Sequence, residues 1–319
     1  MELLTQRQDI EQLLADDRLP PDRRRKLETV LDVREFASRE LGLPDNDSYR
    51  TLVELDRPYV LWNVIAAPEF SVQPRTWCYP LVGCLTYRGW FRRASAERSA
   101  RRLAERGMDV RVVPVAAYST LGRFADPVTS PMLAHDPIGL AGLVLHELAH
   151  QQLFVPGDTR FSEAFATAVE RAGLDRWLTA RGLGEARLRL ARERQVAAEF
   201  VALLLEAKRD LAALYAGPMD EAAMRAAKRQ RLAALREDGA QLAERHATDR
   251  FDRWLASEFN NADLALVATY EEGTRAFAAL LAEYDGDFGR FLQAAQRLSR
   301  QTAETREAFL NSCRTTACP

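Results

Sequence analysis

The second half of the sequence has an almost uninterrupted helical pattern, and this restricts the fold more than any other feature. From about residue 185 onward, apolar residues recur at helical spacing among charged ones. Residues 187–246 predict two long helices that are joined at the sequence AGPMD and form a helical hairpin. Residues 251–299 predict further helices. The second half is therefore predicted to be a helical lobe.

The first half mixes both kinds of secondary structure. Residues 1 to about 42 have a helical pattern with a break at LPPD. β-branched and aromatic residues, punctuated by Pro and Gly, then predict four strands. These strands lie within residues 57–70, 76–81, 84–91 and 108–119. One helix is predicted at 95–107, and another begins at Asp136, a suitable N-cap that is followed by Pro137.

Together these patterns predict an α+β fold in three parts. The parts are an N-terminal helical segment at 1–50, an α+β lobe with a small mixed sheet at 51–184, and the helical lobe at 185–319. No internal repeat is visible, and no long linker rich in Gly, Ser or Pro divides the chain. The three parts can therefore form one continuous domain.

The charges exclude one class of partner and leave the cellular location open. The chain has 44 basic and 46 acidic residues, so it lacks a general attraction to nucleic acid. We interpret the arginine-rich runs near residues 25 and 100 as solvated helix faces.

No apolar run approaches the roughly 20 residues that span a bilayer, and the first residues do not resemble a signal peptide. We expect either a cytoplasmic protein or one whose targeting segment is not included in this sequence.

Four cysteines occur as two close pairs. Cys78 and Cys84 flank a Pro- and Gly-containing turn between strand-like runs, so their sulfurs could face each other across a hairpin. Cys313 and Cys318 lie near the end of the sequence. Neither pair has the spacing of a zinc knuckle or a redox motif. Two disulfides would indicate an oxidising compartment, and reduced, buried thiols are the alternative.

The segment LVLHELAHQQLF contains the strongest chemical signal in the chain. His146 and His150 are four residues apart, so on a helix both can point at one metal ion. Glu147 lies beside the first histidine, where it can reach a water molecule bound to that ion. A third ligand is available after a short loop, where Glu163 stands near the start of a second helical segment. Thr167 and Glu170 follow on the same face and are candidates for orienting the ligands by hydrogen bonding.

The alternative is an ordinary buried helix that carries two core histidines. The short motif arises by chance in some sequences, but Glu147 and Glu163 on apolar helices need a cation or strong hydrogen bonds. We therefore predict a metal site that holds one Zn²⁺ through His146, His150 and Glu163. The other two histidines have structural explanations: His135 is predicted to be a turn residue, and His246 to lie at the end of a helix.

Four segments of the chain resemble a family of bacterial predicted aminopeptidases. These segments are residues 57–91, 115–128, 145–171 and 260–270, and the resemblance extends over nearly the whole chain. It implies a zincin-like, gluzincin-type catalytic core and hydrolysis of peptide substrates. The family typically has Asn-Glu at the start of the second helix, where this chain has Ser162-Glu163. The ligand candidate is thus kept, and Ser162 is expected to cap the helix.

The resemblance also has implications for the cellular location. Such proteins look like envelope lipoproteins, so it implies a bacterial periplasmic or envelope location and a lipid anchor in a longer precursor. Both cysteine pairs would then be oxidised.

The expected chemistry is peptide hydrolysis with Glu147 as the general base. Tyr118 and Tyr270 are both candidates for stabilising the oxyanion, and Glu170, Glu271 and Glu272 are candidates for binding a substrate amine. The strand that contains Pro114 could pair with an extended substrate, because Pro suits an edge strand.

Two other functions are compatible with the same residues. One is a non-catalytic, zinc-stabilised binding or chaperone-like protein of the envelope, which a fourth protein ligand from the helical lobe would favour. The other is hydrolysis of a non-peptide amide. The sequence does not distinguish an exopeptidase from an endopeptidase, and it gives no oligomeric state.

Overall fold

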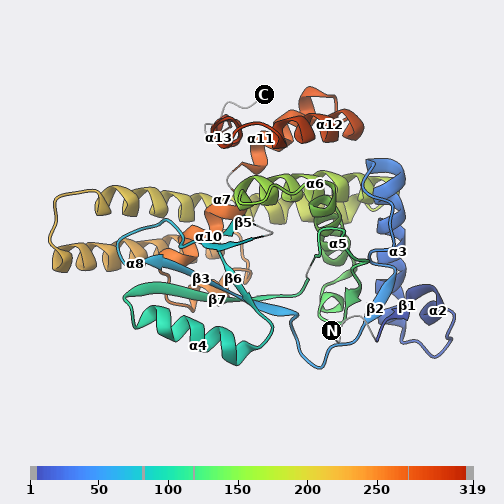
Figure 1. The fold of residues 1–319 in the computed structure, drawn as a ribbon, viewed down its shortest axis with the longest axis horizontal. Coiled ribbons are helices and arrows are strands. Elements are labelled where there is room, and N and C mark those ends of the chain that lie inside the picture. Colours follow the sequence, from blue (N-terminus) through green and yellow to red (C-terminus); the bar gives the residue numbers. More distant parts are fainter. Residues whose placement is uncertain (1–5, 81–82, 118, 272, 314–319) are drawn as a thin grey trace. The chain divides into compact units, whose positions relative to one another are not determined.

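A computed structural model describes residues 6–80, 83–117, 119–271 and 273–313, with the side chains of 268–271 left out of the description (Figure 1). The fold is α+β, as predicted, with small mixed sheets. The chain divides into two compact units that interleave along the sequence. The first unit comprises Met1–Trp62, Pro114–Leu183 and Glu272–Pro319, and the second comprises Asn63–Val113 and Gly184–Glu271. The division of the sequence at residues 50 and 184 stays a prediction.

The first unit is a group of helices beside a small sheet. Its sheet has the order β1 (Gln8–Asp9), β2 (Thr51–Val53) and β8 (Val128–Thr129), with β1 antiparallel and β8 parallel to β2. The prediction of a helix was wrong at Gln8 and Asp9, which form β1. Its helices are α2 (Ile10–Leu14), α3 (Pro21–Leu41), a 3₁₀ turn at Met132–Ala134, α5 (Pro137–Gln152), α6 (Thr159–Ala180), α11 (Thr274–Glu283), α12 (Phe288–Ser299) and α13 (Ala303–Asn311).

The core of this unit forms around α6. α3, α5 and α11 all pack against it. Gly173 of α6 lies against α3, and a Cβ at this position would lie 2.8 Å from Leu41 Cδ1, so the Leu41 side chain would have to shift. On the side of α11, Phe161 and Phe165 contact Phe277 edge-to-face at centroid distances of 5.1 and 5.6 Å. These contacts fix α6, which carries one of the predicted metal ligands.

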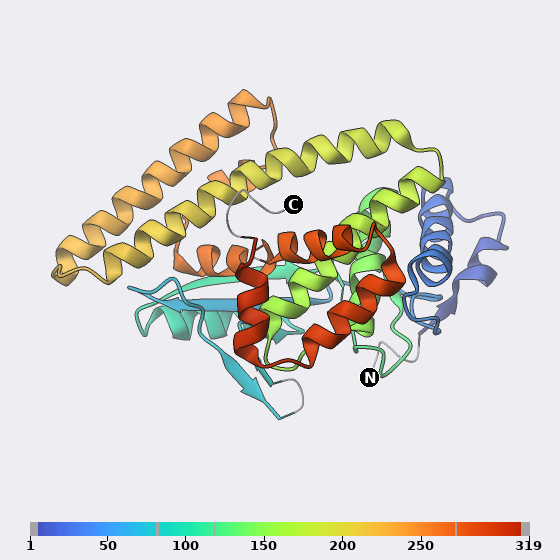
Figure 2. The same ribbon diagram turned by 90° about the horizontal axis from the view of Figure 1, so that it is seen from above.

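The second unit combines a three-stranded sheet with the predicted helical hairpin. The sheet order is β6 (Arg88–Trp90), β3 (Leu61–Pro68), β7 (Met108–Val115), so β7, which contains Pro114, is an edge strand of this sheet. α4 (Arg93–Ala104) packs beside β6. The hairpin consists of α7 (Gly184–Tyr215) and α8 (Glu221–Arg245), which lie side by side (Figure 2). α9 (Asp252–Leu255) and α10 (Asn261–Glu271) complete the unit.

A separate β-hairpin confirms the first predicted cysteine pair. β4 (Trp77–Tyr79) and β5 (Gly83–Leu85) are antiparallel, and Cys78 lies directly opposite Cys84. The two residues form a disulfide. Cys318 lies outside the described residues, so the second pair stays a prediction.

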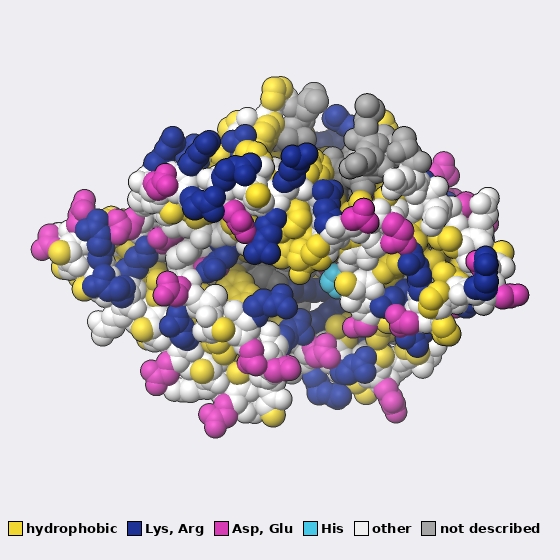
Figure 3. Space-filling view, turned by 90° about the horizontal axis from the view of Figure 1, so that it is seen from below, with side chains coloured by type: hydrophobic (Ala, Val, Ile, Leu, Met, Phe, Trp, Pro, Cys, Tyr) yellow, Lys and Arg dark blue, Asp and Glu magenta, His cyan; other side chains and the backbone are white. Residues whose placement is uncertain are grey.

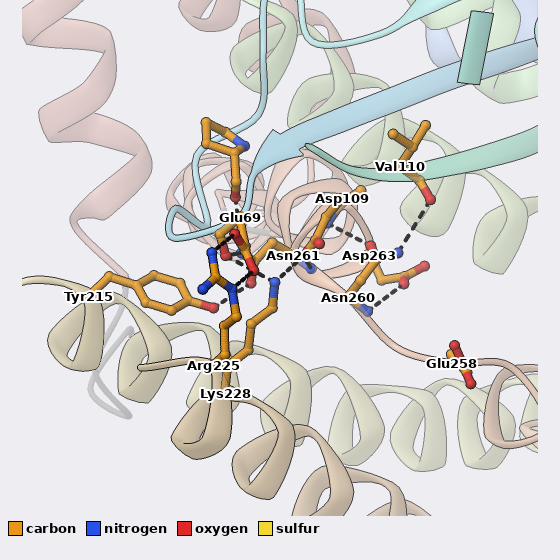
Figure 4. A network of polar contacts seen from close by, with 12 residues as sticks. Glu69, Asp109, Val110, Tyr215, Arg225, Lys228, Glu258, Asn260, Asn261 and Asp263 are labelled. Atoms are coloured by element: carbon orange, nitrogen blue, oxygen red, sulfur yellow. Dashed lines mark hydrogen bonds and ion pairs between the residues drawn. The ribbon is translucent and has the colours of Figure 1, made fainter. Parts of the chain in front are cut away.

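A network of polar contacts connects α8 and α10 to the ends of β3 and β7 (Figure 4). The buried Lys228 donates to Asp109 Oδ2 at 2.6 Å and to the carbonyl of Glu69 at 2.9 Å. Arg225 binds the Glu69 carboxylate, and the Asn261 side chain donates to the same Glu69 carbonyl. The motif NNAD near residue 261 therefore serves to anchor α10.

Candidate metal centre

Helix α5 presents the two histidines at its C-terminal end. The helix begins as predicted at Asp136, whose Oδ1 accepts hydrogen bonds from the amides of Ile138 and Gly139 at 2.8 and 3.0 Å. It is apolar over most of its length and is buried against α3 and α6. Because His146 and His150 are one turn apart, their rings lie together, with centroids 4.8 Å apart.

Helix α6 begins earlier than the sequence suggested. Its N-cap is Asp158, whose side chain accepts from the Phe161 amide at 3.1 Å, so the prediction that Ser162 caps the helix was wrong. Ser162 Oγ instead accepts from the Val155 amide at 3.0 Å and donates to the Asp158 carbonyl at 3.0 Å. These bonds close the loop between the two helices. They leave Glu163 in the second turn of α6, facing α5.

The three predicted ligand atoms form a small triangle. His146 Nε2 and His150 Nε2 are 3.1 Å apart, and Glu163 Oε2 lies 3.4 Å from the first and 3.5 Å from the second. Tetrahedral zinc, with bonds of about 2.0–2.2 Å, separates its ligand atoms by about 3.4 Å. In the part of the chain that the structure describes, these side chains are the one group of His, Cys, Asp and Glu spaced to hold a metal ion.

The lack of a hydrogen bond to Glu163 Oε2 also indicates a site for a cation. Glu163 Oε2 is buried and accepts no hydrogen bond of normal geometry from any described residue. A buried carboxylate oxygen without a hydrogen bond is costly, so the position favours a positively charged neighbour. The donor set and its spacing therefore fit a metal ion.

The electrostatics of the triangle favour positive charge. Burial alone would raise the pKa of Glu163, but the two histidines outweigh it and lower this pKa to about 2. Burial alone would lower the pKa of His146, but hydrogen bonds and charge interactions with Glu163 and Glu170 raise it well above its ordinary value. A cation is thus stabilised at this position, whether it is a proton or a metal ion.

Glu170 orients the first histidine. Its Oε2 lies 3.1 Å from His146 Nδ1, which leaves Nε2 of the same ring directed at the triangle. A carboxylate on the second nitrogen of a metal-binding histidine fixes its orientation. Thr167 is buried one turn from Glu163, and the structure gives it no hydrogen bond to a ligand among the described residues.

Glu147 lies next to His146 on α5 and is not part of the triangle. It is partly exposed and forms no hydrogen bond or ion pair with a described residue. Burial raises the pKa of its carboxyl group above the ordinary value, although the two neighbouring histidines act in the opposite direction. The side chain can therefore exchange a proton closer to neutral pH than an ordinary glutamate.

Sequence reasoning missed a polar cluster beside this end of α5. Gln151 donates to Ser48 Oγ at 3.2 Å and to Asp126 Oδ2 at 3.4 Å. Tyr49 is buried with a φ of 63°, which bulky residues rarely adopt, and its amide donates to the Asp126 carbonyl at 2.6 Å. Burial raises the pKa of the Tyr49 hydroxyl, and the charge of Glu147 raises it further. No local pattern in the sequence marks these residues.

Several other predicted site residues fall outside the description. Tyr118 and Glu272 are not among the described residues. Tyr270 and Glu271 belong to α10, but their side chains are not described. The histidines with structural explanations behave as predicted: His135 ends the 3₁₀ turn before α5, and His246 is the C-cap of α8, 3.0 Å from Glu199.

Comparison with protein families decides the classification. A family model described as "Putative aminopeptidase" matches residues 1–310. The chain belongs to this family. No curated protein and no solved structure matches the chain. The predicted resemblance to bacterial aminopeptidases is thus confirmed as membership of the aminopeptidase family. The matched residues include both helices of the candidate metal centre.

Proposed function

We propose that this member of the aminopeptidase family is a zinc-dependent peptidase. The triangle of His146 Nε2, His150 Nε2 and Glu163 Oε2 carries the proposal, because it provides three protein ligands at the spacing that zinc requires. Catalytic zinc sites have three protein ligands and one open position, whereas structural sites have four. The described residues supply no fourth ligand to this group.

The donor set supports zinc over harder cations. Magnesium and calcium prefer oxygen ligands throughout, whereas two imidazoles and one carboxylate suit zinc. When bound, zinc would lower the pKa of a water ligand from about 15.7 to about 7 and polarise the substrate carbonyl.

Glu147 has the role of general base and then of general acid. It takes a proton from the attacking water as the water oxygen bonds to the carbonyl carbon of the peptide. It returns this proton to the leaving nitrogen as the C–N bond breaks. Without the ion, burial raises the pKa of this carboxyl group, which favours its taking up a proton. Glu170 keeps His146 in the orientation that directs Nε2 at the ion.

We further propose that the protein works in the bacterial envelope and that its precursor carries a lipid anchor. The disulfide between Cys78 and Cys84 supports an oxidising compartment, since such bonds rarely persist in the cytosol. The resemblance to envelope lipoproteins supports the same location.

Metal analysis tests the proposal directly. Protein purified without a metal-affinity tag is compared with Glu163→Ala and Glu147→Gln by mass spectrometry of its metal content. We expect about one zinc per chain in the parent and in Glu147→Gln, and loss of zinc in Glu163→Ala. Fluorogenic peptides with free and acetylated N-termini then define the activity, since an aminopeptidase cleaves the free peptides alone.

The outcomes separate the competing functions. If the parent binds no zinc when zinc is supplied, the metal site is refuted. If it binds zinc but cleaves no peptide, the zinc-stabilised binding protein is the better description. Cleavage of small amides without cleavage of peptides would identify an amidase.

A further inference from the structure

The segment from residue 75 to residue 106 is strongly basic in an otherwise slightly acidic chain. It contains eight arginines and two glutamates, a net charge of +6, whereas the whole chain has a net charge of −2. In the second unit this segment forms the β4–β5 hairpin, β6 and α4, which follow one another along the chain. We call it the arginine surface. Its arginines are Arg75, Arg88, Arg92, Arg93, Arg98, Arg101, Arg102 and Arg106, and all are exposed.

Few of these arginines are neutralised by the protein. Arg93 pairs with Glu97 at 2.8 Å, but Arg92, Arg101, Arg102 and Arg106 form no ion pair with a carboxylate that the structure describes. The arginine-rich run near residue 25 is different, because Arg25 and Lys26 both pair with Asp22, at 2.6 and 2.9 Å. The interpretation as an ordinary solvated face therefore fits that run better than it fits the run near residue 100.

Helix α4 directs its charges away from the sheet. Its buried residues are Ala96 and Leu103, and its exposed face carries Arg98, Arg101 and Arg102. Figure 3 views the molecule from below, the side on which α4 lies in Figure 1. On the left half of this face, where α4 lies in Figure 1, many Lys and Arg side chains lie among hydrophobic and acidic ones.

Aromatic side chains accompany these charges. Tyr79 is 37% exposed and Phe91 is 51% exposed, although both are large. Trp77 and Tyr79 share one side of the hairpin because they are two residues apart on a strand. Arg75 lies over the Trp77 ring at 5.6 Å, and Arg88 lies over the Trp90 ring at 4.7 Å. Aromatic rings beside cationic groups suit the headgroup region of a bilayer.

We infer that the arginine surface binds the anionic headgroups of a lipid bilayer. The charge is complementary to phosphate-bearing lipids, and the exposed aromatic side chains can enter the interface. Nucleic acid has the same charge as these lipids, but the Cys78–Cys84 disulfide lies within the same segment and favours an oxidising compartment, away from the cytosol and nucleus. The inference does not require peptidase activity.

Vesicle binding tests the inference. The full chain is sedimented with vesicles of phosphatidylcholine alone and with vesicles that also contain phosphatidylglycerol. We expect binding to the anionic vesicles and its release at high salt. Replacing Arg98, Arg101 and Arg102 together with Gln should weaken binding about a hundredfold, at about fivefold for each arginine.

A matched variant controls for the loss of charge. Replacing the exposed Arg187, Arg189 and Arg192 of α7 with Gln removes the same charge from another surface and should leave vesicle binding within about twofold of the parent. Unchanged melting temperatures show that both variants fold. Equal weakening by the two variants would overturn the inference, as would equal binding to neutral and anionic vesicles. Tighter binding to a single-stranded DNA probe than to anionic vesicles would assign the surface to nucleic acid instead.

Discussion

Replacing Glu170 with Ala tests whether the centre is built to hold a metal ion. The carboxylate lies 3.1 Å from His146 Nδ1, the nitrogen that does not face the triangle. Loss of such a partner typically weakens metal binding 10–100-fold, or about 1.4–2.8 kcal/mol. Because the Glu170 side chain is 31% exposed, water can partly replace it, and we expect the zinc dissociation constant to rise about tenfold.

The assay is competition for zinc against a chelator of known affinity. Glu170→Gln keeps an oxygen that can accept from Nδ1 but removes the charge, so it should fall between the parent and Glu170→Ala. Glu283→Ala, which removes an exposed glutamate of α11, controls for the change in net charge. If Glu170→Ala binds zinc as tightly as the parent while remaining folded, the contact with His146 is incidental and the assigned role of Glu170 is wrong.

Three further predictions concern Glu147, Lys228 and His146. Glu147→Gln should keep its zinc but lower kcat about 10²–10⁴-fold in a peptidase assay, and an unchanged kcat would exclude Glu147 as the base. Lys228→Met should lower the free energy of unfolding in urea by about 3 kcal/mol, because it removes the cation 2.6 Å from Asp109; a change below about 1 kcal/mol would contradict this. The third prediction concerns protein stripped of metal by a chelator. There, the pKa of His146 is higher in the folded than in the unfolded protein, so protonated His146 stabilises the fold. This stabilisation is complete below the ordinary pKa of 6.5 and is lost as the pH rises toward the raised pKa. The melting temperature should then fall above pH 6.5, and added zinc should abolish the fall.

The clustering of the three candidate ligands could be predicted because its determinants are local. His146, His150 and Glu163 lie on two consecutive helices joined by a short loop, and the loop length alone brings the helices side by side. The cysteine pair at 78 and 84 was predictable for the same reason, since one turn places them opposite each other. Where two local signals competed, the prediction failed: Asp158 and Ser162 can both cap a helix, and Asp158 does so.

Contacts between distant segments could not be predicted. The cluster of Ser48, Asp126 and Gln151 joins three loops or helix ends that are more than 20 residues apart, and each residue is unremarkable in its own segment. The pairing of Lys228 with Asp109 connects the helical hairpin to a strand 119 residues earlier. Such partners are set by packing of whole elements, which a single sequence does not encode as a local pattern.

The charges of the centre favour a catalytic over a structural role. One divalent ion in the triangle would be balanced by two carboxylates, Glu163 as its ligand and Glu170 through His146. Glu147 is then not needed to neutralise the ion, and its carboxyl group has no described partner. A structural site has no use for a half-buried acid without a described partner beside it, because partial desolvation of that acid costs stability. Its presence is explained if Glu147 must accept and release a proton at the ion.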